Sequence, residues 1–130
     1  MILADTSAWV EFLRRTGSPV DECIDQLLGE PGALCTTDVV VMEVLAGARD
    51  ASHREQLRGL LAVCEFTPVE GLRDYECAAD LYRTCRAAGE TIRALTDCLI
   101  AAVAIRTGNA ILHTDSDFDA LARHGPLQLA

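Results

Sequence analysis

The sequence predicts an α/β fold, a three-layer sandwich in which a central parallel sheet of short strands is flanked by helices. Short apolar segments alternate with longer helical ones along the chain, which favours parallel strands joined by right-handed crossovers. Capping and helix-stopping residues separate the segments. A length of 130 residues, half of them apolar, suits a single domain spanning residues 1–130 with its own core.

Strands are expected where short apolar runs stand between turn or capping residues, and helices where the runs are longer. The predicted strands are Ile2–Ala4, Leu34–Thr36, Glu65–Val69, Ala110–His113 and Leu127–Leu129. The predicted helices are Thr6–Arg15, Pro19–Leu28, Asp38–Ala48, Ser52–Val63, Leu72–Ala88, Asp97–Thr107 and Phe118–Arg123. Thr6 and Ser7 supply capping hydroxyls for the first helix, and Thr96 supplies one for the sixth. Ser18 followed by Pro19 is a strong start for the second.

The composition argues against a secreted or membrane protein. The longest charge-free apolar run, Cys98–Ile105, is far too short to cross a bilayer. The N-terminus has no basic segment ahead of its apolar stretch, unlike a signal peptide. The six cysteines form neither CxxC pairs nor zinc-type clusters with histidine, so reduced, buried thiols are expected. The expected location is the cytoplasm.

The net charge of −9 argues against a broad basic surface for nucleic acid. All eleven basic residues are arginines, however, and arginine suits bidentate contact with phosphate. An acidic cluster also becomes a phosphate site once it has bound a divalent cation. The candidates for phosphate contact are Arg14, Arg15, Arg86 and Arg93. Arg93 is favoured because its loop leads directly into the helix that begins at Asp97.

Four acidic residues stand where solvated surface acids are not expected: Asp5, Glu43, Asp97 and Asp115. Asp5 and Asp115 closely follow predicted strands, and ligands of parallel sheets bind beyond the carboxyl ends of the strands. Glu43 and Asp97 adjoin long apolar runs, where an uncompensated ionised carboxylate is costly. Mutual repulsion in such a group would require a cation to hold it together.

A pocket of carboxylates without histidine or cysteine ligands selects hard cations such as Mg²⁺ or Mn²⁺. Its natural chemistry is phosphodiester hydrolysis, because a bound cation acidifies water and stabilises the charge that develops on the phosphate. Taken singly, Asp5 and Asp97 can be helix caps, and Asp115 can be a turn residue. Glu43 lies inside a predicted helix with apolar neighbours and has no such explanation. The joint pattern therefore indicates a metal site.

With these residues assembled, the chain resembles the PIN-domain nucleases, and within them the VapC toxins of bacterial toxin–antitoxin pairs. The matching segments, in chain order, are Ile2–Glu11, Met42–Gly47, Leu95–Ala102 and His113–Phe118. Each motif is weak alone, but their order and separation fit along essentially the whole chain. The resemblance covers all four acids without a departure.

The resemblance implies a PIN-like sandwich and a Mg²⁺-dependent endoribonuclease. It implies that the catalytic, metal-binding acids are Asp5, Glu43, Asp97 and Asp115, with Asp117 as an additional metal ligand. Thr6 or Ser7 would orient the first carboxylate or reach a bound water. The resemblance further implies RNA as substrate, a homodimer, and a cognate antitoxin that blocks the site, often by inserting an arginine.

Two other classes of function remain open. Receiver domains and haloacid-dehalogenase-type phosphatases also place an aspartate after the first strand, but both use a lysine, which this chain lacks, and Asp5 has no second aspartate two positions on. A catalytically silent PIN-like module could bind a metal or a peptide through the same acids. A calcium loop beginning at Asp115 is excluded, because Ala120 and Pro126 stand where it needs glycine and glutamate. His113 is a candidate general base, although a strand histidine bonded within the sheet is more common.

Overall fold

The sheet at the centre of the molecule confirms the expected α/β sandwich. The computed structural model describes residues 1–130. Its strands are β1 (Ile2–Ala4), β2 (Leu34–Thr36), β3 (Glu65–Phe66) and β4 (Ala110–Leu112). They form one sheet in the order β3-β2-β1-β4, and all neighbouring pairs are parallel. In the register of this sheet Ile2 lies between Leu34 and Ala110, so β1 is an inner strand.

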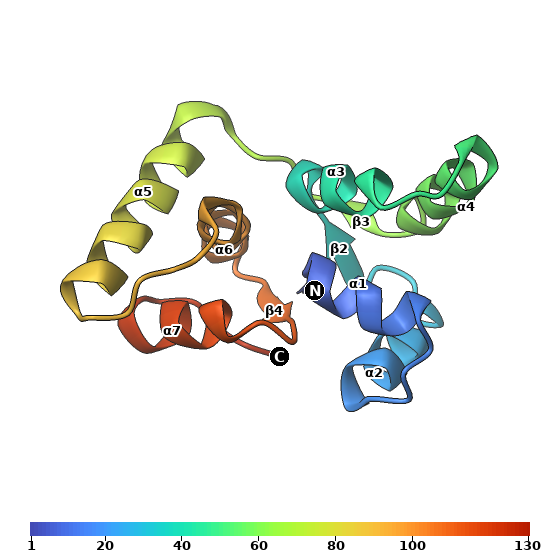
Figure 1. The fold of residues 1–130 in the computed structure, drawn as a ribbon, viewed down its shortest axis with the longest axis horizontal. Helices are drawn as coiled ribbons and strands as arrows, with labels where there is room; N and C mark the ends of the chain where they lie inside the picture. The colour runs from blue at the N-terminus through green and yellow to red at the C-terminus, as the bar shows by residue number, and fades with distance from the viewer.

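Helices cover the sheet on both sides. They are α1 (Thr6–Leu13), α2 (Pro19–Leu28), α3 (Asp38–Ala46), α4 (Ala51–Leu61), α5 (Gly71–Ala87), α6 (Leu95–Thr107) and α7 (Ser116–His124). Figure 1 shows α5, α6 and α7 on one side of the strands and α1 to α4 on the other. The crossovers from β1 to β2 and from β2 to β3 run in one direction along the sheet, whereas the connection from β3 to β4 returns past β1. Right-handed crossovers of opposite direction place their helices on opposite faces, which accounts for the three layers.

The core follows from the apolar runs of the sequence. Leu3 of β1, Cys35 of β2 and Ile111 of β4 are fully buried, and so is Trp9 of α1. Every residue of α6 from 97 to 104 is buried, so this helix is the centre of its layer. Gly108 adopts a left-handed conformation that ends α6, as the glycine predicted.

Several predicted boundaries are wrong. The strand expected over Glu65–Val69 ends at Phe66, and Leu127–Leu129 contributes one isolated parallel bridge, between Leu129 and Ile111, in place of a strand. The helix that was expected to reach Arg15 ends at Leu13, and it is capped by Asp5 and not by the hydroxyls of Thr6 and Ser7. The helices expected over Asp38–Ala48 and Ser52–Val63 are each shorter at their carboxyl ends. Terminal turns depend on tertiary contacts as well as on local preference, which explains errors of this size.

The start of α6 differs in a way that affects the site. Thr96 does not cap the helix, because α6 begins at Leu95 and Ala94 occupies the capping position without a side-chain hydrogen bond. Asp97 therefore lies inside the first turn and is not a cap. The last helix begins earlier than predicted, at Ser116, and Asp115 caps it by accepting a hydrogen bond from the backbone N–H of Asp117.

The cysteines and helices agree with the composition. All six cysteines are free thiols. Three of them are buried, as expected for residues that act as small hydrophobic side chains, and the other three are partly exposed. None of the helices combines the length and the apolar character needed to cross a lipid bilayer.

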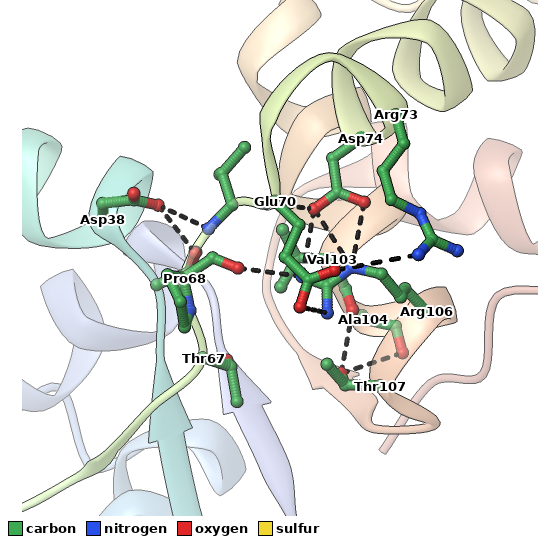
Figure 2. Close-up of polar contacts among 12 residues, drawn as sticks. Asp38, Thr67, Pro68, Glu70, Arg73, Asp74, Val103, Ala104, Arg106 and Thr107 are labelled. Carbon is green, nitrogen blue, oxygen red and sulfur yellow. Dashed lines mark hydrogen bonds and ion pairs between the residues drawn. The ribbon is translucent and has the colours of Figure 1, made fainter.

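A buried ion pair that the sequence did not reveal joins α5 to α6. The guanidinium of Arg106 donates three hydrogen bonds of 3.0–3.2 Å to the carboxylate of Asp74, and Nη2 also donates to the carbonyl of Pro68 at 2.8 Å. The backbone N–H of Glu70 donates to Asp74 at 2.8 Å. Figure 2 shows these groups converging from α5, the end of α6 and the segment that leaves β3. Burial alone would raise the pKa of Asp74, but the hydrogen bonds from Arg106 and Glu70 outweigh it and hold that pKa below its usual value.

Candidate metal centre

Two of the singled-out acids lie at the point where the direction of the crossovers reverses. Asp5 immediately follows β1, and Asp115 follows β4, the strand beside it. The helix after β1 belongs to one layer and the helix after β4 to the other, as Figure 1 shows. In open α/β sheets such a switch point leaves a crevice beyond the carboxyl ends of the strands. The topology therefore brings together two residues from opposite ends of the chain.

Asp5 is a buried carboxylate with one satisfied oxygen. Its Oδ2 accepts hydrogen bonds from the backbone N–H and the hydroxyl of Ser7, at 3.0 and 2.7 Å. Its Oδ1 is buried and has no hydrogen-bond partner. Burial raises the pKa of Asp5, the hydrogen bonds from Ser7 and Thr6 oppose that rise, and the charge of Asp115 adds to it.

The two hydroxyls after Asp5 hold different carboxylates. The Ser7 hydroxyl bonds to Asp5 and accepts the backbone N–H of Thr114 at 3.0 Å, so it links the ends of β1 and β4. Thr6 Oγ1 donates instead to Oε1 of Glu43 at 2.9 Å. Ser7 therefore lies where it orients the first carboxylate, while Thr6 orients the acid on α3.

Glu43 comes from α3 and is partly buried. Burial raises the pKa of Glu43, the hydrogen bond from Thr6 opposes the rise, and the charge of Asp5 adds to it. Since the effect of Asp5 is electrostatic repulsion, the two carboxylates are close enough in space to resist simultaneous ionisation. The carboxylate of Glu43 accepts one hydrogen bond, from Thr6, so it has further lone pairs with which it can bind a metal ion.

Asp97 is the most perturbed acid of the group. Only 7% of its surface is exposed, and its Oδ2 is buried without a hydrogen-bond partner. Burial and the charges of Asp5, Asp115, Asp117 and Glu43 raise the pKa of Asp97 to about 8. All four of these neighbours are acids that the sequence singled out, so the structure brings the whole predicted set into electrostatic contact.

Asp97, Asp115 and Asp117 form the tightest part of the group. Each can present one carboxylate oxygen such that the three oxygens lie within 4.8 Å of one another. Asp115 and Asp117 already have a positive partner in Arg93. Arg93 Nη2 donates to Asp115 Oδ1 at 2.8 Å, its Nε donates to Asp117 Oδ1 at 3.4 Å, and its backbone N–H donates to Asp117 Oδ2 at 3.1 Å. The structure therefore places Arg93 as a counter-ion of the acidic group.

His113 does not face this group as a free base. Its Nδ1 accepts the backbone N–H of Asp115 at 3.1 Å, and its Nε2 lies 3.6 Å from Oδ1 of Asp119. The ring packs against Phe118 with a centroid distance of 5.2 Å. Both nitrogens thus have neighbours in the turn and helix that follow β4. The sequence favoured a strand histidine bonded within the sheet, but His113 lies just after β4, which ends at Leu112.

The donor set fits a divalent cation. Asp5 and Asp97 each keep a buried oxygen without a partner, and buried carboxylate oxygens are costly in that condition. Burial is the largest cause of the raised pKa values of Asp5, Glu43 and Asp97, and neither Ser7 nor Thr6, which bond to Asp5 and Glu43, carries a positive charge. Because every donor is a carboxylate, the chemistry of the set matches hard cations.

A pocket of about 390 Å³ opens beside the acidic group, between α1, α3 and α4. Thr6 and Glu43 line one part of it, and Arg14, Arg49 and His53 line another. Arg14 is one of the arginines predicted from the sequence to contact phosphate, whereas Arg49 and His53 were not predicted. Their one sequence signal was their short distance along the chain from the Glu43 helix, which does not distinguish them from other surface residues.

The family model, the sequence relatives and the solved structures that this chain matches agree with one another. The model of the PIN domain family matches residues 2–124. Ribonuclease VapC11 of Mycobacterium tuberculosis strain ATCC 25618 / H37Rv is 45% identical over 131 residues, which cover 100% of this chain and 98% of that protein.

Two solved structures show the same fold. VapBC-1 from nontypeable Haemophilus influenzae matches with a TM-score of 0.76 and 17% identity, over 100% of this chain and 97% of that one. A toxin–antitoxin complex from Klebsiella pneumoniae matches with a TM-score of 0.69 and 20% identity, over 91% of this chain and 90% of that one.

Proposed function

Because the chain belongs to the PIN domain family and, within it, to the VapC ribonucleases, we propose that its acidic group binds Mg²⁺ and hydrolyses phosphodiester bonds inside RNA chains. Asp5, Glu43, Asp97 and Asp115 would hold the cation, and Asp117 would assist. Mn²⁺ has the same preference for carboxylate oxygens and would serve as a substitute. RNA in the cytoplasm is the substrate that this proposal implies.

One observation carries the assignment of residues. Asp5 and Asp97, which come from different layers of the sandwich, each keep a buried carboxylate oxygen without a hydrogen-bond partner. An arrangement that served stability alone would satisfy these oxygens with hydrogen-bond donors, as Asp74 is satisfied by Arg106. A cation shared by the two carboxylates would supply the missing partner, and it would add Asp5 to the group of Asp97, Asp115 and Asp117, whose oxygens lie within 4.8 Å of one another.

Different residues of the chain have different roles in such a site. When bound, a divalent cation would supply positive charge to the phosphodiester and make a water molecule more acidic. Ser7 and Thr6 hold the carboxylates of Asp5 and Glu43 in fixed orientations through their hydroxyls. Arg93 neutralises part of the charge of Asp115 and Asp117, which lowers the barrier that an acidic surface presents to RNA.

The test incubates the purified protein with structured RNAs in Mg²⁺ or in EDTA. Cleavage in Mg²⁺ is expected to disappear in EDTA and in the Asp5→Asn and Glu43→Gln variants, with circular dichroism showing retained folding. Asp25→Asn, which changes an exposed acid on α2, is the matched control and is expected to cleave normally. Metal binding without cleavage of any RNA would instead support a silent binding module. Phosphorylation of Asp5 by a small phosphate donor would support phosphate-transfer chemistry.

We further propose that a cognate antitoxin protein blocks this site and that the protein is a homodimer, as the family resemblance implies. A similar fold occurs in the toxin–antitoxin complex from Klebsiella pneumoniae. An antitoxin arginine could pair with Asp5 and Asp97, whose buried oxygens lack partners. Sedimentation of the protein alone and with the product of a neighbouring gene for a small DNA-binding protein tests both statements.

A further inference from the structure

We infer that the pocket between α1, α3 and α4 binds the stretch of RNA on one side of the cleaved bond, with its arginines on a flanking phosphate. This inference rests on the proposed function and assigns the pocket as a subsite of it. The pocket's volume of about 390 Å³ lies within the range of roughly 300–1,000 Å³ that is typical of small-ligand sites. That space suits one nucleotide of a longer strand.

The pocket is continuous with the acidic group. Thr6 and Glu43, which are joined by a 2.9 Å hydrogen bond, belong to both. A strand whose phosphodiester lay at the carboxylates would therefore have an adjacent nucleotide in the pocket.

Unpaired positive charge is concentrated in this pocket. Seven of the eleven arginines form ion pairs with acids: Arg54, Arg58, Arg73, Arg83, Arg93, Arg106 and Arg123. Of the four that do not, Arg86 lies over the ring of Tyr82 and Arg15 lies outside the pocket. The remaining two, Arg14 and Arg49, are exposed and line the pocket. In a protein with a net charge of −9, two free guanidinium groups beside an acidic centre are suited to an anion.

The rest of the lining suits a nucleoside. His53 Nδ1 accepts the backbone N–H of Arg49 at 3.1 Å, so a neutral ring carries its proton on Nε2 and can donate from there. Val10, Leu13 and Leu57 supply an apolar surface against which a base can pack. The pocket therefore offers a suitable contact to each part of a nucleotide: the phosphate, the ribose hydroxyl and the base. A purely acidic protein segment would use the arginines but would leave the apolar surface without a partner.

Unpaired arginines lie on only one side of the acidic group. On the side of α7, Arg93 is already engaged by Asp115 and Asp117, whereas on the side of α3 Arg14 and Arg49 are free. The protein therefore attracts the RNA backbone on the Glu43 side of the cleaved bond more strongly than on the other side.

The test measures binding of a fluorescently labelled single-stranded RNA in an Asp97→Asn background, in which cleavage is not expected. Arg14→Gln and Arg49→Gln are compared with Arg83→Gln on α5, which changes the net charge equally but lies outside the pocket. Each pocket variant is expected to weaken binding by about 5–10-fold at low salt. Each should also reduce the slope of log Kd against log salt concentration by about 0.7, the value for one phosphate contact on a single strand. Arg83→Gln should change neither quantity.

The same substitutions in the otherwise unmodified protein are expected to raise KM for RNA and to leave kcat unchanged. Equal binding and equal salt slopes in the pocket and control variants would overturn the inference. So would weaker binding of an oligoglutamate peptide together with unchanged RNA binding, because that result assigns the pocket to a protein partner. The Asp5→Asn cleavage test addresses the proposed function separately, so failure of one is distinguishable from failure of the other.

Discussion

The hydroxyl of Thr6 donates a 2.9 Å hydrogen bond to Oε1 of Glu43, and so ties the first residue of α1 to the middle of α3. This bond orients the carboxylate of Glu43, a proposed metal ligand, although Thr6 itself is not a ligand. Outer hydrogen bonds of this kind typically contribute 10–100-fold to metal affinity.

Thr6→Val is therefore expected to weaken Mn²⁺ binding by about 10-fold, because Glu43 loses the donor that orients it and opposes its raised pKa. Thr6→Ser keeps a hydroxyl and should restore most of the affinity. Isothermal titration calorimetry with Mn²⁺ measures both. Equal affinities in Thr6→Val and the unmodified protein would show that the bond does not support a metal ligand.

The stability of the metal-free protein should depend on pH through Asp97. Its pKa is about 8 in the folded protein, compared with the ordinary value of 3.8, so the folded state binds more protons than the unfolded state between these values. The free energy of unfolding in EDTA should accordingly fall as the pH rises from about 4 to about 8, by up to about 1.4 kcal/mol per pH unit, and then level off. Asp5 and Glu43, whose pKa values are also raised, add in the same direction.

Urea unfolding at about pH 5 and at about pH 8 measures this dependence. Asp97→Asn removes the titrating group and should flatten the curve, with stability at about pH 8 equal to or higher than that of the unmodified protein. Clear destabilisation by Asp97→Asn at both pH values would favour a structural role for the carboxylate.

Arg93→Gln tests whether this arginine is a counter-ion of the acids. Without its bonds to Asp115 and Asp117, the metal-free protein should melt at a lower temperature, because the carboxylates repel one another more strongly. Saturating Mg²⁺ should then raise the melting temperature of Arg93→Gln by more than that of the unmodified protein. An identical metal-induced shift in both proteins would mean that Arg93 and the cation do not act on the same charges.

Arg106 and Asp74 offer a structural comparison remote from the proposed chemistry. Asp74 is 2% exposed, so Arg106→Gln should leave a buried, poorly compensated carboxylate and destabilise the protein by about 3–5 kcal/mol. Asp74→Leu combined with Arg106→Met should recover most of that loss. Chemical denaturation at pH 7 measures both variants, and a small effect of Arg106→Gln alone would contradict the interpretation of this ion pair.

Much of the fold was predictable because its signals are local. Short apolar segments marked β1, β2 and β4, and Gly108 marked the end of α6. The boundary errors occur where tertiary contacts decide the outcome. Leu127–Leu129 has a strand-like sequence but only one bridge to Ile111, and Thr96 has a capping side chain but lies within the first turn of the helix.

The grouping of the acids was predictable for a related reason. The rule that ligands lie beyond the carboxyl ends of parallel strands brings Asp5 and Asp115 together once the strands are placed. Glu43 was conspicuous because it interrupts an apolar helix. Arg49, His53 and the bond between Arg106 and Asp74 could not be found in this way, because each depends on the packing of helices that no short sequence motif records.

The most direct test of the shared metal site is a crystal structure of the protein grown with Mn²⁺, with the ion located by its anomalous scattering. We predict an anomalous peak within coordination distance of both Asp5 and Asp97, next to the carboxylate oxygens that have no hydrogen-bond partner. We also predict that Asp97→Asn crystals lose the peak. Absence of a peak at these oxygens at saturating Mn²⁺, or its persistence in Asp97→Asn, would contradict the account.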